Sequence, residues 1–115
     1  MGKRDYIKYK ELARVLVKNR IAEYNQVYGF RVNRIAIKNT KSRWGSCSKK
    51  GNLNFNYRVA LLSPDMADYV IVHELCHLGQ FNHSAKFWEL VGRTIPNYKN
   101  IKNKFKNRIA RNRAR

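Results

Sequence analysis

The stretch HELCHLGQFNH, residues 73–83, constrains this chain more than any other feature. It contains all three histidines of the 115-residue sequence, His73, His77 and His83. On an α-helix, residues four apart lie on the same face, so the first two histidines can bind one ion together. Glu74 is rotated about 100° from His73 around a helix, which places its carboxylate beside the ligands without making it a ligand. The stretch therefore predicts a metal site built around a helix.

The residues before this stretch predict a buried helix. Ser63 suits the N-cap, Pro64 suits the first helical position, and Asp65 favours the positive end of the helix dipole. The apolar run YVIV leads directly into His73, so we expect a buried or half-buried helix rather than a solvated surface helix. Gly79 is a suitable end for this helix and would let the chain fold back.

Two residues are candidates for the third metal ligand. His83 follows just after the expected helix end, whereas Glu89 lies further along the chain, and we favour His83. A structural zinc is normally closed by four protein ligands, and the fourth would have to be Cys47, Cys76 or Glu89. Three histidines instead leave one position for water, as a hydrolytic zinc requires, with Glu74 as the general base. The sequence thus predicts one zinc ion per chain.

Hydrophobic periodicity predicts helices before and after a small sheet. One helix is expected over residues 5–28, where apolar residues recur at three- and four-residue steps until Gly29. Two more follow the histidine helix, one capped by Ser84 and one that begins near Asn97. The histidine helix is therefore expected to pack among other helices.

The segment between the first two helices predicts strands. Alternating side chains indicate a strand over residues 34–38, followed by a hairpin of strands at 43–48 and 52–59 with its turn at Gly51. The expected order is one helix, about three strands and three helices. This order indicates an α+β fold in one domain, residues 1–115.

The chain is strongly basic, with 25 Lys and Arg against 7 Asp and Glu and a net charge of +18. No acidic residue follows Glu89, and basic residues crowd the helix and tail over residues 97–115. A docked helix with a solvated basic face accounts for this pattern, and non-specific nucleic-acid binding is the alternative. The candidate contacts to nucleic acid are Lys102, Lys104, Lys106, Arg108, Arg111 and Arg113.

The cysteines and the hydropathy pattern indicate in which compartment the protein is expected. Cys47 and Cys76 form no CxxC pair, and the first residues lack the apolar core of a signal peptide. No run of residues is long and apolar enough to span a bilayer. We therefore expect reduced thiols, a cytoplasmic location and no membrane association.

The sequence resembles the YgjP-like metallopeptidase family. The resemblance runs over about residues 10–105 and is most specific over 41–99, in KSRWGSCSKKGNLNFNYRVALLSPDMADYVIVHELCHL, NHSAKFWELV and PNYK. NHSAKFW is also similar to the segment after HExxH in SprT-like proteases, where a histidine supplies the third ligand. Typical YgjP-like proteins are longer, with an N-terminal sheet region that this chain lacks, so the contacts that region makes with substrate are expected to be absent.

The resemblance implies both a fold and a set of roles. The fold would be a minimal zincin-like domain, with His73, His77 and His83 on zinc and Glu74 as the base. The RWGS segment of the family corresponds to residues 43–46. One member of the family is described as a UTP pyrophosphatase, so membership alone does not decide the reaction.

Three polar residues are candidates for substrate contacts. Arg43 could steady an oxyanion or a phosphate, or form a salt bridge at the end of a strand, and the resemblance favours the first role. Asn54 and Asn56, together with Asn52, could line an exposed edge strand to which a substrate peptide adds, although simple solvent exposure also explains each of them.

These features favour a zinc-dependent hydrolase whose substrate is a peptide or protein. In this hypothesis zinc polarises the scissile carbonyl while Glu74 takes a proton from water and passes it to the leaving amine. The first alternative is a nucleotide pyrophosphohydrolase acting on UTP. The second is a basic nucleic-acid-binding module with a structural zinc.

Overall fold

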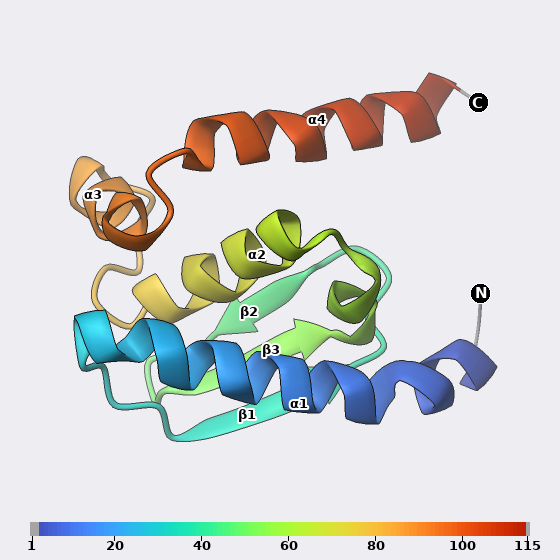
Figure 1. Cartoon of the computed structure of the whole chain (residues 1–115), viewed down its shortest axis with the longest axis horizontal. Coiled ribbons are helices and arrows are strands. Elements are labelled where there is room, and N and C mark those ends of the chain that lie inside the picture. Colours follow the sequence, from blue (N-terminus) through green and yellow to red (C-terminus); the bar gives the residue numbers. More distant parts are fainter. Residues whose placement is uncertain (1–2, 115) are drawn as a thin grey trace.

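Four α-helices, a short 3-10 helix and three strands make up the described part of the chain (Figure 1). This computed structural model describes residues 3–114, and the side chains of residues 3–107. In chain order the elements are α1 (Lys3–Tyr28), β1 (Arg34–Lys38), β2 (Gly45–Cys47), β3 (Asn52–Asn56), η1 (Tyr57–Leu61), α2 (Pro64–Cys76), α3 (Ala85–Thr94) and α4 (Tyr98–Ala114). The α+β class and the order of helices and strands are confirmed.

The sheet is mixed, with the strand order β1-β3-β2. Strand β1 pairs with β3 in parallel, and β2 pairs with β3 in antiparallel. The expected hairpin of β2 and β3 is therefore present, and Gly51 makes its turn with a positive φ of 86° that favours glycine. The expectation that the asparagines line an edge strand is wrong, because β3 is the central strand of the sheet.

The last strand is shorter than expected. β3 ends at Asn56, and residues Tyr57–Leu61 form the 3-10 helix η1 instead of continuing the strand to residue 59. The side chain of Asn56 accepts a hydrogen bond from the backbone N–H of Arg58 at 2.9 Å and so caps η1. This local bond diverts the chain from the sheet.

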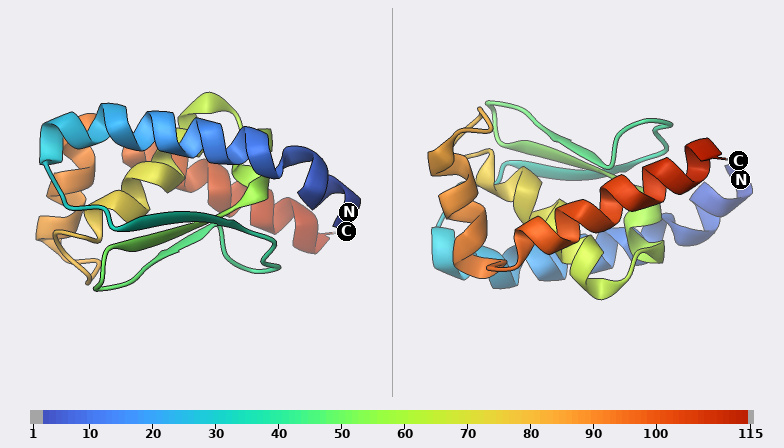
Figure 2. Two further views of the ribbon diagram at one scale, coloured as in Figure 1. Left: turned by 90° about the horizontal axis from the view of Figure 1, so that it is seen from below. Right: turned by 90° about the horizontal axis from the view of Figure 1, so that it is seen from above.

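Helices α1 and α2 cover one face of the sheet, and no helix covers the opposite face in the described structure (Figure 2). The core lies between these layers. Its fully buried members are Val17 of α1, Leu53 and Phe55 of β3, and Ile71 and Leu75 of α2. Helix α4 runs along α2 on the side away from α1 (Figure 1).

The chain reverses after α2 and brings the next segment back over it. Helix α2 ends at Cys76, three residues before the expected stop, and backbone hydrogen bonds continue a turn through Gly79. A Cβ on Gly79 would lie 2.7 Å from the ring of Phe30, so only glycine fits this close approach. Helix α3 begins where expected, because the Ser84 side chain accepts from the backbone N–H of Phe87.

Candidate metal centre

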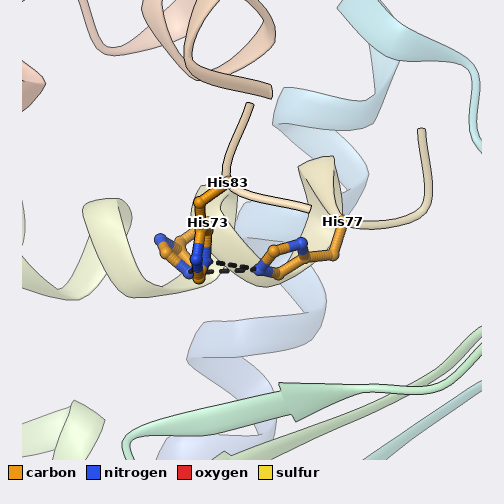
Figure 3. A group of neighbouring side chains, drawn as sticks. All are labelled: His73, His77 and His83. Atoms are coloured by element: carbon orange, nitrogen blue, oxygen red, sulfur yellow. Dashed lines mark hydrogen bonds between the residues drawn. The ribbon is translucent and has the colours of Figure 1, made fainter. Parts of the chain in front are cut away.

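Three imidazole rings meet at the C-terminal end of α2 (Figure 3). His73 lies in the last turn of α2, His77 caps the helix, and His83 comes from the loop before α3. Their Nε2 atoms form a triangle with sides of 3.2 Å for His73–His77, 3.2 Å for His73–His83 and 3.1 Å for His77–His83. The structure therefore places the three predicted ligands at one point.

This triangle fits a tetrahedral zinc ion. Zinc–nitrogen bonds of about 2.0–2.1 Å imply neighbouring ligand atoms about 3.3–3.4 Å apart in a tetrahedral site. The rings of His73 and His77 are also in the protonation state that a metal needs. Burial, followed by the nearby imidazoles, lowers the pKa of His73 to about 3, and burial also lowers the pKa of His77. Both rings are thus neutral near pH 7 and offer a nitrogen lone pair.

Neighbouring groups hold the rings in place. The Nδ1 of His77 lies 3.0 Å from the carbonyl oxygen of Gln80, so an Nδ1–H can donate there and leave Nε2 for a metal. The Phe87 ring stacks on His77 with centroids 4.4 Å apart. Among the described residues, Nδ1 of His73 is buried without a hydrogen-bond partner, so packing fixes that ring. These neighbouring groups, together with the four-residue spacing of His73 and His77 on the helix, therefore fix the positions of the Nε2 atoms.

Glu74 lies next to the triangle and outside it. It is 8% exposed, and burial raises the pKa of its carboxyl to about 7. A Cβ on Gly45 would lie 2.8 Å from Cγ of Glu74 and 2.9 Å from the backbone oxygen of Asn54. Strand β2 can therefore approach the carboxylate closely only because residue 45 is glycine. Sequence reasoning did not single out Gly45, although a glycine inside a strand is a signal of close backbone approach.

A cavity of ≈ 320 Å³ opens beside His73 and Glu74. Part of its lining comes from the segment that leads into β2, including Arg43 and Trp44, and part from Phe105 of α4. Arg43 is thus placed at the site as expected, and its side chain is exposed. Phe105 was not among the candidate site residues predicted from the sequence.

The two asparagines proposed as substrate contacts have other partners. The Asn54 side chain donates to Oγ of Ser46 at 3.2 Å. Asn56 is buried, and its side chain donates to the backbone oxygen of Thr40 at 2.6 Å as well as capping η1. These bonds hold the sheet and the loop before β2, so Asn56 is not available to a substrate.

The alternative ligands considered from the sequence, Glu89, Cys47 and Cys76, are not part of the histidine cluster. The metal-capable cluster in the described residues consists of the three histidines, and Glu89 is exposed on α3 outside it. Cys76 is fully buried and Cys47 half-buried, and both are free thiols. Burial raises the pKa of each thiol to about 11, so neither is a thiolate near pH 7. They pack as small apolar residues.

The basic C-terminal segment is only partly described. The ammonium of Lys102 lies 4.6 Å from the ring centroid of Trp88, and that of Lys104 lies 2.5 Å from the carboxylate of Asp65. Lys106 is exposed. The side chains of Arg108, Arg111 and Arg113 lie outside the described part of the structure. Over the residues searched, no helix is both long enough and apolar enough to cross a membrane.

Comparison with solved structures identifies the fold. The metallopeptidase zymogen abylysin of Pyrococcus abyssi superposes with a TM-score of 0.72 at 23% identity, covering 82% of this chain and 95% of that one. The metallopeptidase zymogen jannalysin of Methanocaldococcus jannaschii gives a TM-score of 0.70 at 24% identity, covering 81% and 96%. At such identities the likeness establishes a shared fold.

The sequence comparison identifies the family. No curated protein matches the sequence. The family model described as "YgjP-like, metallopeptidase domain" matches residues 4–108, which is nearly the whole chain. The metallopeptidase fold of the two solved relatives agrees with this match. The chain therefore belongs to the YgjP-like metallopeptidase family.

Proposed function

We propose that this metallopeptidase binds one zinc ion through His73, His77 and His83 and hydrolyses peptide bonds with Glu74 as the general base. The observation that carries the proposal is the triangle of Nε2 atoms, with sides of 3.1–3.2 Å, beside a buried carboxyl that is not part of it. A structural zinc site would not require an acid held at that position. Zinc at the triangle would supply Lewis acidity to the scissile carbonyl and to an attacking water.

Glu74 moves the protons in this proposal. Its carboxylate accepts a proton from the attacking water and then donates it to the nitrogen of the leaving amine. In the metal-free protein the pKa of this carboxyl is about 7, and the positive charge of a zinc ion at the triangle would lower it, so the ionised form would be available to accept the proton near neutral pH. Burial produces this value, and Gly45 allows β2 to cover the carboxyl.

The substrate backbone would pair with β2. Within the described sheet, β2 pairs on one side only, with β3. Hydrogen bonds from Asn56 to the oxygen of Trp44 and from Ser48 to the oxygen of Asn52 show which residues of this segment face β3. Because antiparallel residues alternate, the backbone groups of Gly45 and Cys47 point to the free edge. A peptide added there would lie beside Glu74.

Pyrophosphate hydrolysis is less well supported by the geometry. A triphosphate needs several cations near the reacting group; among the described residues Arg43 is the one Lys or Arg in the cavity lining, and Lys102, which lies close enough to His73 to lower its pKa, is a further cation near the triangle. Lys38 shares a separate cavity of ≈ 200 Å³ with Arg43, and that lining includes none of the three histidines. The site therefore favours a neutral amide over a nucleotide.

One parallel experiment tests the reaction. Zinc-loaded protein is incubated with casein, with short peptides and with UTP, each against the Glu74→Gln variant. We expect peptide hydrolysis by the wild type, and a fall of roughly 100-fold or more in the variant, since removal of a general base costs about 10²–10⁴. The variant should keep its zinc. Turnover of UTP alone would replace the peptidase proposal, and no turnover of any substrate would favour a structural zinc in a binding module.

A further inference from the structure

The cavity beside Glu74 has the size and position of a side-chain pocket. Its volume is ≈ 320 Å³, and both His73 and Glu74 contribute to its lining. Pockets for whole small molecules range from about 300 to 1,000 Å³, so this one lies at the lower limit. It therefore suits one large side chain, on a residue next to the bond that the site would cleave.

The walls of the cavity are mainly apolar, and three large aromatic side chains contribute to them. Trp44 precedes β2, Tyr69 and Val70 lie one turn before His73 on α2, and Phe105 belongs to α4. The Phe105 ring lies 5.6 Å from the ring of Tyr69 and 5.8 Å from the ring of Trp44, in centroid distances. Three segments distant in sequence thus meet around one apolar space.

Helix α4 is anchored along the turns that lead up to Phe105. Toward its start, the Tyr98 ring stacks on Trp88 with centroids 5.1 Å apart, and Ile101 is 2% exposed. Next to Phe105, Lys104 forms an ion pair with Asp65 at the start of α2. These contacts hold Phe105 against the other walls.

We propose that this cavity is the specificity pocket of the peptidase, selecting substrates with a bulky apolar or aromatic residue beside the scissile bond, and that Phe105 is a specificity-determining wall. The inference rests on the proposed function. A large apolar side chain gains by leaving water for these walls, whereas a glycine or alanine leaves the space unfilled. Exposed Arg43 in the lining disfavours lysine and arginine in the same position.

The first test is a set of quenched fluorogenic peptides that differ at one position, carrying Phe, Leu, Ala, Gly or Lys. In the wild type, kcat/KM should be roughly 10–100-fold higher for Phe and Leu than for Gly, in the range that pocket methylenes provide. Phe105→Ala should reduce kcat/KM for the Phe and Leu peptides by about 10-fold and leave the Gly peptide within about twofold. Lys106→Ala, the neighbouring exposed residue on the same helix, is the matched control and should change nothing.

Three outcomes of this test overturn the proposal. An equal loss of kcat/KM for every peptide in Phe105→Ala would mean that Phe105 supports the site in general and does not select the substrate side chain. An equal gain for every peptide would mean that α4 obstructs the cleft instead of shaping it. A wild type that hydrolyses all five peptides at similar rates would remove the specificity pocket while leaving the proposed peptidase intact.

A binding test does not depend on turnover. The sequence has two tryptophans, so the indole N–H signal of Trp44 can be assigned in NMR spectra with a Trp88→Phe variant. In zinc-loaded Glu74→Gln protein, a hexapeptide with central Phe should shift the Trp44 signal in a saturable manner. The Gly hexapeptide should bind roughly 10-fold more weakly. Equal affinities, or no shift at Trp44, would contradict the pocket even if the wild type had no peptidase activity.

Discussion

Helices α2 and α4 run side by side at the site, and they differ in how firmly the fold holds them. Helix α2 buries most of its length, with Ile71, Val72 and Leu75 fully inside the core. In the described part of α4, Ile101 is the buried side chain, while Phe105 is half-buried and the lysines are exposed. Glu74, His73 and the helix-capping His77 belong to the firmly held helix, with His83 brought back to it by the following loop, whereas Phe105, the proposed specificity residue, lies on the lightly docked one.

This difference has a physical reason. A metal triangle and a general base must keep their geometry to within a fraction of an ångström, which a buried helix secures through close packing on every side. A pocket wall needs only to exclude water and match a shape, and a side chain held by a few contacts can do so. Substitutions on α2 should therefore abolish function, whereas those on α4 should adjust it.

The largest expected effect concerns the metal ligands. His83→Ala should lower zinc affinity by more than about 100-fold, because the loss of an outer-shell partner alone costs about 10–100-fold. Glu89→Ala is the matched control, since Glu89 is exposed outside the histidine cluster, and it should bind zinc normally. Titration against a chromophoric chelator at constant pH measures both. Loss of zinc in Glu89→Ala with retention in His83→Ala would reverse the ligand assignment.

The second prediction concerns the contact between α2 and β2. In Gly45→Ala the new Cβ would press on Glu74 and on the backbone of Asn54, so the strand must move away from the helix. We expect a loss of stability of about 1–3 kcal/mol, typical of overpacking, together with a large loss of activity and normal zinc content.

The control for this contact is Ser46→Ala on the same strand. Its hydroxyl accepts one hydrogen bond from Asn54, and its loss should cost about 1 kcal/mol with activity retained. Urea unfolding of the zinc-free proteins gives the two free energies. A Gly45→Ala protein with normal stability and activity would show that β2 does not need its close approach to Glu74.

The third prediction concerns the attachment of α4. The hydrogen bond from Lys104, followed by that from Ser63, lowers the pKa of Asp65 to about 2 from its usual 3.8. A depressed carboxyl pKa stabilises the fold above the unfolded value and loses that effect as the pH falls toward the folded value. Lys104→Gln should therefore lower Tm by a few degrees at pH 6, and the difference should shrink between pH 4 and pH 2.

The reference for this measurement is Lys106→Gln, which removes an equal charge from an exposed site on the same helix. It should leave Tm nearly unchanged over the same pH range. A Tm difference in Lys104→Gln that stays constant down to pH 2 would mean that Asp65 is not the partner through which Lys104 stabilises α4.

The two helices also differ in how far their roles could be predicted from sequence. The histidine helix was predictable because its signals are local: four-residue spacing, an apolar run and a proline near its start. The edge-strand role of Asn54 and Asn56 was wrong because strand order depends on which strand inserts between the others, and β3 does so through parallel pairing with β1. Phe105 was missed as a pocket wall for the same reason, since its partners Trp44 and Tyr69 are distant in sequence.

The smallest effect is expected at the basic end of α4, where nucleic-acid contacts were predicted. Lys102 and Lys104 already have partners in Trp88 and Asp65, so any such contacts fall mainly to the residues after them. Ending the chain after Lys106 removes Arg108, Arg111, Arg113 and Arg115. Each lost phosphate contact should flatten the log–log dependence of duplex DNA affinity on salt by about 0.9, while zinc content and peptide cleavage stay nearly unchanged. Fluorescence anisotropy of labelled DNA in a salt series measures both slopes, and identical slopes would show that this end is a solvated face.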